Sequence, residues 1–451
     1  MKMYYFRLLV ILLPFSYLLS EISAQNPIVT PGLYIADPSS HVWKDGRLYV
    51  YGSRDESPAY YCSHDHYVLS TADLLHWDVV PDAFASAGKN DQVPYSDDFL
   101  YAPDCQYKDG MYFLYYCLAS SVNTEGVATS PSPAGPFLNG RVIDLGGINQ
   151  IDPCVFMDDD GQAYYIWGQF SAKMAKLKPN MVEIDKSTIR DGVVTEKDHF
   201  FHEGGYMVKR NGIYYFVYAH MGRAGMPTCI GYSTSRSPMG PFKYGGVIID
   251  NDHCDPGNWN NHGSIVEFKG KWYVLYHRAT HNSVAMRKAC IEPITFNSDG
   301  SINEVEMTTQ GAAGPLNALN RMDAERACLM FGNVRIQSCA RDNEELACIR
   351  NNDRAGYKYL DFGEGVDSFS VRLAPGRNGG RIDIALDNQW GLSPGYIDVP
   401  GGGNGTSWVT LTGKISPVNG IHAIWLRFEG KGEDLYNLDW FQFFRKKSAE
   451  K

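Results

Sequence analysis

Three acidic residues, Asp37, Asp152 and Glu203, occupy the same position in a repeated sequence pattern. Each lies nine residues before a glycine that ends a short polar turn (Gly46, Gly161 and Gly212). One Asp before a proline commonly just begins a turn. Three acids at one offset of a repeat are different, because converging carboxylates repel each other and folds tolerate that cost mainly at functional sites. The pattern therefore predicts acid–base chemistry.

Three converging carboxylates fit the hydrolysis of a glycosidic bond. That reaction needs one protonated acid for the leaving oxygen and one ionised carboxylate acting on water or on the sugar. A third carboxylate raises the pKa of the acid through like-charge repulsion. Proline follows both Asp37 and Asp152 and is expected to hold them extended, whereas glycine after Glu203 permits close approach of backbone or ligand.

The turn that follows each acid belongs to a hairpin that recurs five times. A run of alternating aromatic and β-branched residues starts at each turn glycine, with glycine-to-glycine spacings of 64, 51, 51 and 58 residues (Gly46, Gly110, Gly161, Gly212 and Gly270). Asp-Gly and Asn-Gly are strong hairpin signals. A further strand precedes each turn (residues 40–43, 104–107, 153–156, 205–208 and 264–268). Five such hairpins predict an all-β, five-bladed β-propeller over residues 25–312.

A propeller would bring the three acids to one mouth of its central channel, provided that the first strand of each hairpin is the innermost. In the second and fifth repeats the same offset gives Tyr101 and Asn261, with His262 beside it. A second repeat supports the blade count: residues 130–137 match residues 235–242, and both segments are expected to be rigid loops before an outer strand.

The repeat stops near Gly311, and a different pattern begins. Residues 311–315 form a linker of small residues, and short alternating strands follow between glycine-rich turns (residues 368–373, 381–386 and 423–428). This predicts a second domain, a jelly-roll-like antiparallel β-sandwich over residues 319–446.

Composition narrows the class of ligand. The net charge is −10 and no long basic stretch is present, which argues against nucleic acid as a partner. Aromatic residues make up 13% of the chain, which suits both sheet cores and stacking on sugars. The ten cysteines are scattered without a CxxC pair, so a zinc site is not expected.

Residues 1–24 resemble a secretory signal peptide. Lys2 and Arg7 supply positive charge, residues 8–19 are mostly apolar, and residues 22–24 are a small-residue cleavage site before Gln25. The apolar run is too short to span a bilayer comfortably. We expect a secreted or periplasmic protein without a membrane span.

Around these motifs the sequence resembles glycoside hydrolase family 43 over residues 27–310. The resemblance implies an inverting enzyme in which Asp37 is the general base, Asp152 orients the acid and modulates its pKa, and Glu203 is the general acid. It implies a metal ion or an ordered water at His262. Separately, we expect no cofactor for catalysis and consider a structural Ca²⁺ ion at the axis or in the second domain. The resemblance also implies that Arg287 lines the sugar subsite, and four aromatic or histidine side chains are further candidates for sugar contact (Trp43, Tyr101, His220 and Trp259).

The tail resembles carbohydrate-binding module family 6 over residues 319–445. The matching segments are residues 321–326, 379–384 and 437–441. Asn437 is kept, but Gly405 stands where the family usually has an aromatic residue that stacks on the ligand. We therefore expect the module to buttress the propeller or to bind sugar through another surface.

Taken with the resemblance, the three acids predict an exo-acting enzyme that releases terminal pentose, chiefly α-L-arabinofuranose. The expected substrates are arabinan, arabinoxylan or arabinogalactan. A β-xylosidase is the nearest alternative, because it would share the three acids. A non-catalytic sugar-binding propeller is an alternative of a different class, and it predicts binding without turnover.

Overall fold

The computed structural model describes residues 25–120, 124–340 and 342–445. The predicted signal peptide and residue 446 lie outside this range. The regular secondary structure of the described part is almost entirely β-strand, and none of its helices is long and apolar enough to cross a membrane. Its helices are single turns: α1 (Glu196–His199), η1 (Gly88–Asn90), η2 (Lys186–Thr188), η3 (Gly311–Ala313) and η4 (Ala324–Arg326).

The first nineteen strands form five sheets in chain order, all antiparallel. The first sheet holds β1 (Ile35–Val42), β2 (Leu48–Arg54), β3 (Asp65–Thr71) and β4 (Asp78–Ala85). The second holds β5 (Asp104–Lys108), β6 (Met111–Cys117), β7 (Glu125–Ser130) and β8 (Leu138–Val142). The third holds β9 (Cys154–Met157), β10 (Ala163–Trp167), β11 (Ser171–Lys176) and β12 (Arg190–Thr195). The fourth holds β13 (Phe201–Arg210), β14 (Ile213–His220), β15 (Cys229–Ser235) and β16 (Lys243–Asp250), and the fifth holds β17 (Ser264–Phe268), β18 (Lys271–Thr280) and β19 (Ser283–Ile294).

The five predicted hairpins are confirmed, and each joins the first two strands of a sheet. Their turn glycines all have φ between 71° and 90°, a left-handed conformation that only glycine adopts freely (Gly46, Gly110, Gly161, Gly212 and Gly270). In three of the turns the preceding residue is left-handed too, as the tightest two-residue hairpins require (Asp109, Asn211 and Lys269).

The fifth sheet departs from the four-stranded pattern, because it has three strands of its own. The beginning of the described chain lies along its last strand, β19. Asn26 accepts a hydrogen bond from Ile291 N (2.9 Å), and Ile28 N donates to Ala289 O (2.9 Å). The first residues of this region thus fasten onto its last sheet.

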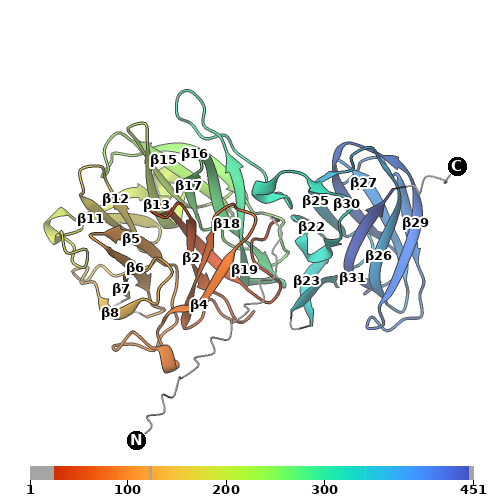
Figure 1. Ribbon diagram of the computed structural model, residues 1–451, viewed down its shortest axis with the longest axis horizontal. Coiled ribbons are helices and arrows are strands. Elements are labelled where there is room, and N and C mark those ends of the chain that lie inside the picture. Colours follow the sequence, from red (N-terminus) through yellow and green to blue (C-terminus); the bar gives the residue numbers. More distant parts are fainter. Residues whose placement is uncertain (1–24, 121–123, 341, 446–451) are drawn as a thin grey trace, which may run out of the picture.

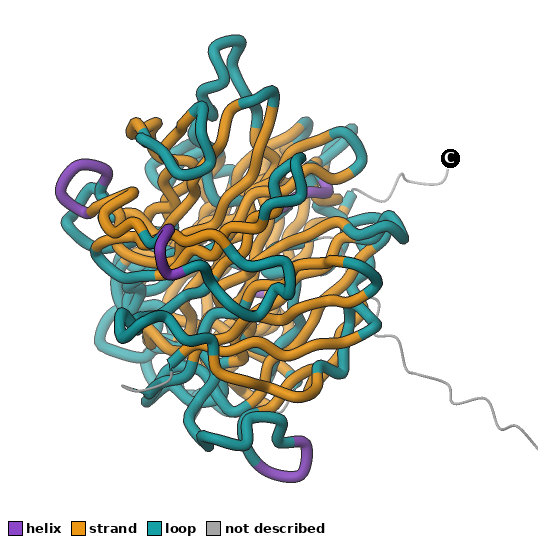
Figure 2. The backbone as a smooth tube through the Cα atoms, turned by 90° about the vertical axis from the view of Figure 1, so that its left-hand side faces the viewer, coloured by secondary structure: helices purple, strands orange, loops and turns teal. Residues whose placement is uncertain are grey.

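The first strands of the five sheets contact one another in succession, and β17 contacts β1 again. Asp104, which is 1% exposed, joins three of these strands: it accepts hydrogen bonds from Ser39 Oγ (2.5 Å) and from Val155 N (2.7 Å). Ser264 Oγ donates to Pro38 O (2.8 Å) and joins the fifth sheet to the first. Figure 2 faces this region and shows strands inside with loops and short helices around them.

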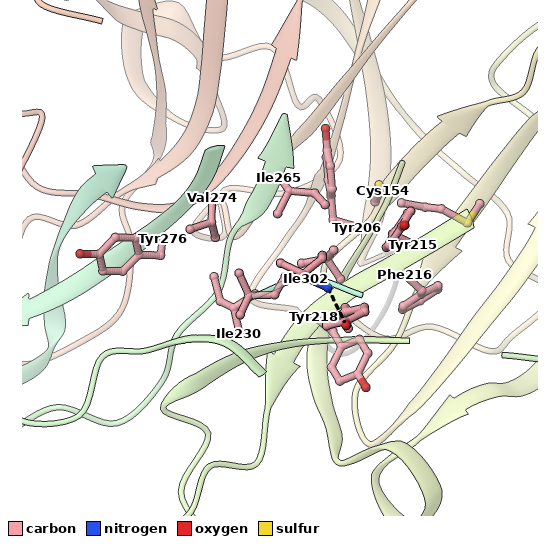
Figure 3. Close-up of a cluster of buried hydrophobic side chains, with 14 of the residues drawn as sticks. Cys154, Tyr206, Tyr215, Phe216, Tyr218, Ile230, Ile265, Val274, Tyr276 and Ile302 are labelled. Atoms are coloured by element: carbon pink, nitrogen blue, oxygen red, sulfur yellow. Dashed lines mark hydrogen bonds between the residues drawn. The ribbon is translucent and has the colours of Figure 1, made fainter. Parts of the chain in front are cut away.

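Apolar side chains fill the spaces between neighbouring sheets. Figure 3 shows one such cluster, in which Tyr206, Ile265 and Val274 come from the fourth and fifth sheets and are buried. Ile302 extends it from beyond the last strand, and its backbone N–H donates to the Tyr232 hydroxyl (2.9 Å). This packing fixes how each sheet is placed against the next.

The C-terminal region consists of two further sheets around one hydrophobic cluster, separate from the first five sheets in Figure 1. One runs β20 (Leu316–Asn317), β25 (Arg354–Asp361), β30 (Ile421–Glu429), β27 (Gly380–Leu386) and β28 (Gly395–Val399), with β22 (Leu329–Phe331) on β25. The other runs β23 (Arg335–Ala340), β24 (Asn343–Ala347), β31 (Tyr436–Phe444), β26 (Val366–Pro375) and β29 (Val409–Val418), with β21 (Met322–Asp323) on β31. The predicted strands in this region correspond to β26, β27 and β30.

Candidate active site

One pocket collects side chains from the starts of the first strands. Asp37 lies in β1, Glu203 lies in β13, and Asp152 lies two residues before β9. All three line the same pocket, as do eleven further residues (Tyr61, Cys62, Tyr101, Ala102, Ile151, Gln169, His202, Trp259, Asn260, His262 and Arg287). The structure therefore brings together the three acids that share one offset in the sequence.

The backbone at the acids is irregular, and this aims them into the pocket. Asp37 (φ 53°) and Asp152 (φ 61°) are left-handed, so the expectation that the following prolines hold them extended is wrong. The register of β1 shifts between Ala36 and Ser39, and that of β13 shifts on both sides of Glu203. Bulges re-aim side chains, and strained backbone of this kind clusters at functional sites.

Gly204 shows why a glycine follows Glu203. A Cβ atom at this position would lie 2.6 Å from both Cδ2 and Nε2 of His262, and the residue has φ of 65°. At this position β13 comes so close to His262, which lies two residues before β17, that only a residue without a side chain fits.

A buried arginine sits between two carboxylates at the base of the pocket. Arg287 Nη1 donates to Asp37 Oδ1 (2.8 Å), while its Nε and Nη2 donate to the two oxygens of Asp55 (2.9 Å each). Arg287 is 3% exposed and Asp55 is 2% exposed. Sequence reasoning placed Arg287 at the sugar subsite, and the structure makes it in addition the main cation of the acidic group.

Arg287 controls the charge of Asp37. Burial opposes ionisation of Asp37, but the positive charge of Arg287 and a hydrogen bond with His262 outweigh burial and hold its pKa well below the usual range. Ser53 Oγ also donates to Asp37 Oδ2 (2.8 Å). These contacts favour the ionised form of Asp37, which is the form that a proton acceptor must have.

Arg287→Met is expected to lower the free energy of unfolding by about 3–5 kcal/mol, because two carboxylates stay buried without their cation. The depressed pKa of Asp37 stabilises the fold above its unfolded pKa, and that contribution is lost as pH falls through the folded value. The deficit of the variant should hence be largest near neutral pH and shrink in acid, which urea unfolding at several pH values measures.

The control for this variant is Arg223→Met. Arg223 is an exposed arginine whose Nη2 lies 2.6 Å from Glu304 Oε1. A surface ion pair of this kind contributes about 0–1 kcal/mol. Equal losses in the two variants would contradict the role given to Arg287.

The two histidines beside Asp37 have pKa values shifted in opposite directions. His262 Nδ1 lies 3.5 Å from Asp37 Oδ1 and 4.0 Å from Asp152 Oδ2. Burial alone would lower the pKa of His262, but the hydrogen bond with Asp37 and the nearby negative charges raise it to about 9. His277 Nδ1 instead accepts from Asp37 N (3.2 Å), and burial lowers the pKa of His277 to about 3. His262 is thus a second cation in the pocket, and His277 is neutral.

The other two acids have different surroundings. Burial, opposed in part by His262 and reinforced by the charges of Glu203 and Asp37, raises the pKa of Asp152. Glu203 accepts a hydrogen bond from Gln169 Nε2 at Oε2 (2.9 Å) and a longer one from Asn260 Nδ2 at Oε1 (3.5 Å). The pocket therefore contains a carboxylate kept ionised, a carboxyl group biased towards its neutral form, and a third held by amide donors.

Two of the predicted sugar-contact residues line this pocket. Tyr101 comes from just before β5, and Trp259, which is 41% exposed, comes from the segment before β17. Both stay candidates for stacking on an apolar face of a sugar.

Two others lie elsewhere, which corrects the prediction. Trp43 follows the far end of β1, where its Nε1 donates to the Tyr51 hydroxyl (2.9 Å) and its ring stacks on His41. His220 ends β14, one strand away from β13, and its ring packs on Phe200 and Tyr244. Both side chains fill contacts between strands.

Sequence reasoning missed several pocket residues. The offset of nine selects Asn261 in the fifth sheet, but Asn261 is fully buried and donates to Thr228 O (3.1 Å), whereas its neighbours Asn260 and His262 line the pocket. Strand-like alternation would have found Asn260. Tyr61 and Gln169 lie outside the first strands, where no repeat marks them.

The structure also bears on the cysteines and on the expected metal ion. All ten cysteines are free thiols, eight of them buried. Cys62 lies in the pocket, and Arg287 Nη2 donates to its sulfur (3.5 Å). Within the described ranges, no group of three or more His, Cys, Asp or Glu side chains is placed to hold a metal ion.

Comparison with known proteins gives a consistent result. The model of Glycosyl hydrolases family 43 matches residues 24–302, and that of Carbohydrate binding module (family 6) matches residues 323–445. An arabinoxylan arabinofuranohydrolase of Bacillus subtilis is 29% identical, with 94% of this chain and 93% of that protein covered. A xylosidase/arabinosidase of Thermoclostridium stercorarium is also 29% identical, with 90% and 96% covered. A crystal structure of the Bacillus subtilis family 43 arabinoxylan arabinofuranohydrolase with cellotetraose is 28% identical, has a TM-score of 0.54, and covers 94% of this chain and 99% of that one.

Proposed function

Because the chain belongs to Glycosyl hydrolases family 43, we propose that it is an inverting, exo-acting glycoside hydrolase that releases terminal α-L-arabinofuranose from side chains of plant polysaccharides. It is an enzyme of the arabinofuranosidase or xylosidase type, as its relatives are. The observation that carries the proposal is the pocket in which Asp37, Asp152 and Glu203 meet with different neighbours.

The proposed mechanism gives each acid one role. Glu203 protonates the glycosidic oxygen, while Asp37 removes a proton from the water that attacks the anomeric carbon from the opposite face. The ion pair with Arg287 suits Asp37 for this step, since a base must be ionised. Asp152 orients the acid and modulates its pKa, and its own raised pKa limits the repulsion among three carboxyl groups.

Exo-action is supported by the size of the pocket. Its volume is about 220 Å³, below the range of about 300–1,000 Å³ typical of pockets for drug-sized ligands. A small pocket suits one terminal sugar better than a run of several. Arabinan, arabinoxylan and arabinogalactan are the proposed substrates, and the name of the Bacillus subtilis relative favours arabinoxylan among them.

A β-xylosidase is the second candidate. The Thermoclostridium stercorarium relative is named xylosidase/arabinosidase, and this double name favours xylosidase activity as the second candidate for this chain. Both reactions use the same three acids, and only the fit of the sugar in the pocket separates them.

The domain plan belongs to the same proposal. We propose that the five sheets are the blades of a β-propeller over residues 25–312 and that the two C-terminal sheets form a β-sandwich over residues 319–446. The succession of contacts from β1 to β17 and back to β1 supports the propeller, and the shared core of the two sheets supports the sandwich.

Secretion or periplasmic export is proposed from Lys2, Arg7 and the apolar residues 8–19. The reaction needs no cofactor, and a structural Ca²⁺ ion stays a prediction.

The test is a panel of 4-nitrophenyl glycosides and plant polysaccharides, with released sugars identified by chromatography. We expect free arabinose from the α-L-arabinofuranoside and from arabinoxylan, and little xylose from xylo-oligosaccharides. Proton NMR of the first minutes should show β-arabinofuranose as the first product, because inversion changes the anomer. Preferred release of xylose would favour the second candidate. Release from no pentoside would contradict the proposal, and retention of the anomer would contradict the inverting mechanism.

A further inference from the structure

One carboxylate of the C-terminal region is fully buried against the N-terminal region. Glu344 lies in β24 and is 0% exposed. Carboxylates are almost never fully buried unless they are paired. The partners of Glu344 belong to the other region of the chain, so this residue crosses the interface.

The partners of Glu344 are a tyrosine and a lysine. The Tyr34 hydroxyl donates to Oε1 (2.7 Å), and Lys288 Nζ donates to Oε2. Lys288 Nζ also lies 5.2 Å from the centre of the Tyr34 ring. Burial opposes ionisation of Glu344, but Lys288 and the hydrogen bond from Tyr34 outweigh it and lower its pKa. The cluster is thus a buried ion pair with a hydroxyl donor.

Both partners adjoin the residues that set the charge of Asp37. Tyr34 comes three residues before Asp37, and its carbonyl accepts a hydrogen bond from Asp55 N (3.1 Å). Lys288 directly follows Arg287, which binds Asp37 and Asp55 through its guanidinium group. Glu344 therefore ties together the two segments whose relative position sets the distance between Arg287 and Asp37.

Stability alone gives no reason for a buried ion pair here. Apolar residues of similar volume at such sites are often as stabilising or more so. What an ion pair adds is directional contacts, which hold two segments in one arrangement.

The cleft beside Asn437, where modules of family 6 usually bind sugar, lacks, in the part that the structure describes, an aromatic ring that could stack on a ligand. The pocket beside Asn437 is lined by glycines and polar side chains, and its aromatic residue, Tyr436, is buried with its hydroxyl bonded to Arg381 O (2.7 Å). No ring among the residues described there is free to stack on a sugar.

We propose that Glu344 is a positioning residue for hydrolysis: through Tyr34 and Lys288, the C-terminal module holds Arg287 in register with Asp37. The module then completes the active site from outside the pocket. This inference rests on the proposed role of Asp37 as the base.

Glu344→Gln tests the inference, because it keeps the shape of the side chain and removes the charge opposite Lys288. We expect kcat on 4-nitrophenyl α-L-arabinofuranoside to fall by about 10- to 100-fold, as small misplacements of catalytic groups do, with KM changed less. If the panel identifies another glycoside as the preferred substrate, that glycoside is used. The acid limb of the pH profile of kcat/KM should move to higher pH, because looser contact with Arg287 raises the pKa of Asp37.

The matched control is Glu306→Gln. Glu306 accepts from Lys358 Nζ (2.6 Å) and also from the Tyr359 hydroxyl, so it forms an ion pair across the same interface with different partners. We expect this variant to keep both kcat and the acid limb. The inference is overturned if Glu344→Gln lowers only the melting temperature, or if both variants shift the acid limb equally.

A milder variant covers the case in which Glu344→Gln does not fold. Tyr34→Phe removes one hydroxyl from the cluster and should shift the acid limb in the same direction; an unchanged limb would overturn the inference. Failure of the underlying function would look different. In that case Asp37→Asn would retain wild-type activity, whatever Glu344→Gln does.

Discussion

Glu203→Gln is expected to slow the release of arabinose from arabinoxylan by about 10²- to 10⁴-fold, the usual contribution of a general acid. The alkoxide of a sugar is a poor leaving group and needs the proton that Glu203 supplies. A phenol with a low pKa leaves without it. The same variant should therefore lose much less activity on 4-nitrophenyl α-L-arabinofuranoside, and the ratio of the two losses is the quantity to measure.

Glu196→Gln is a suitable control for the acid variant. Glu196 is a half-exposed carboxylate near the pocket, 3.8 Å from His202 Nδ1, and it contacts none of the three acids in the interactions described. We expect its rates to stay within about twofold of wild type on both substrates, as surface changes have small effects. Equal losses on natural and activated substrates in Glu203→Gln would contradict its role as the acid.

Asp37→Asn is expected to lower kcat by about 10³- to 10⁴-fold on both kinds of substrate. The base acts on the attacking water, so a better leaving group cannot replace it. The asparagine oxygen can still accept a hydrogen bond from Arg287, and the asparagine NH2 group can donate to the Ser53 hydroxyl, so the fold should persist, which circular dichroism and the melting temperature check.

Azide provides the complementary test for the base. It attacks without losing a proton, so it should restore part of the activity of Asp37→Asn on the activated substrate and yield a glycosyl azide of inverted configuration. It should do nothing for Glu203→Gln on arabinoxylan, where departure of the sugar is the obstacle. Rescue of the acid variant but not of the base variant would reverse the two assignments.

Arg287→Met tests how the ion pair between Arg287 and Asp37 contributes to the pH dependence of the activity. With Asp37 intact, its depressed pKa keeps the base ionised, so activity should not be lost on the acid side until pH falls far below the ordinary range of a carboxyl group. Loss of Arg287 removes the largest of the effects that lower the pKa of Asp37, so that pKa should rise. The acid limb of Arg287→Met should thus lie at higher pH than that of the wild type.

The sequence alone was sufficient for the local elements and for the three acids. Hairpin turns depend on a few residues with positive φ, so the five turn glycines could be read directly from Asp-Gly, Asn-Gly and Lys-Gly pairs. In a repeated hairpin, residues that lie the same number of positions before the turn glycine take equivalent places in their sheets. For this reason Asp37, Asp152 and Glu203 reach one pocket. The same reasoning failed in the fifth sheet, where Asn261 turns away and its neighbours turn in.

The sequence could not predict where single side chains point or which distant residues they contact. Trp43 comes six residues after Asp37, just past the end of β1, and a rise of about 3.3 Å per residue carries it roughly 20 Å away from the pocket. Arg287 could be matched to a sugar subsite, but its contacts with Asp37 and Asp55 join residues more than two hundred positions apart. No local pattern encodes such a pairing.

For the acidic pocket, then, the sequence by itself determined which three carboxylates meet, because the spacing of a repeat is a one-dimensional property. The tertiary structure decided the charge and the surroundings of each carboxylate. Arg287 reaches Asp37 from β19, and His262 reaches it from the segment before β17. Burial raises the pKa of Asp152, and Glu344 of the C-terminal region binds Tyr34 and Lys288. These effects depend on distances between segments remote in sequence, and charge and burial at a site are set by such distances.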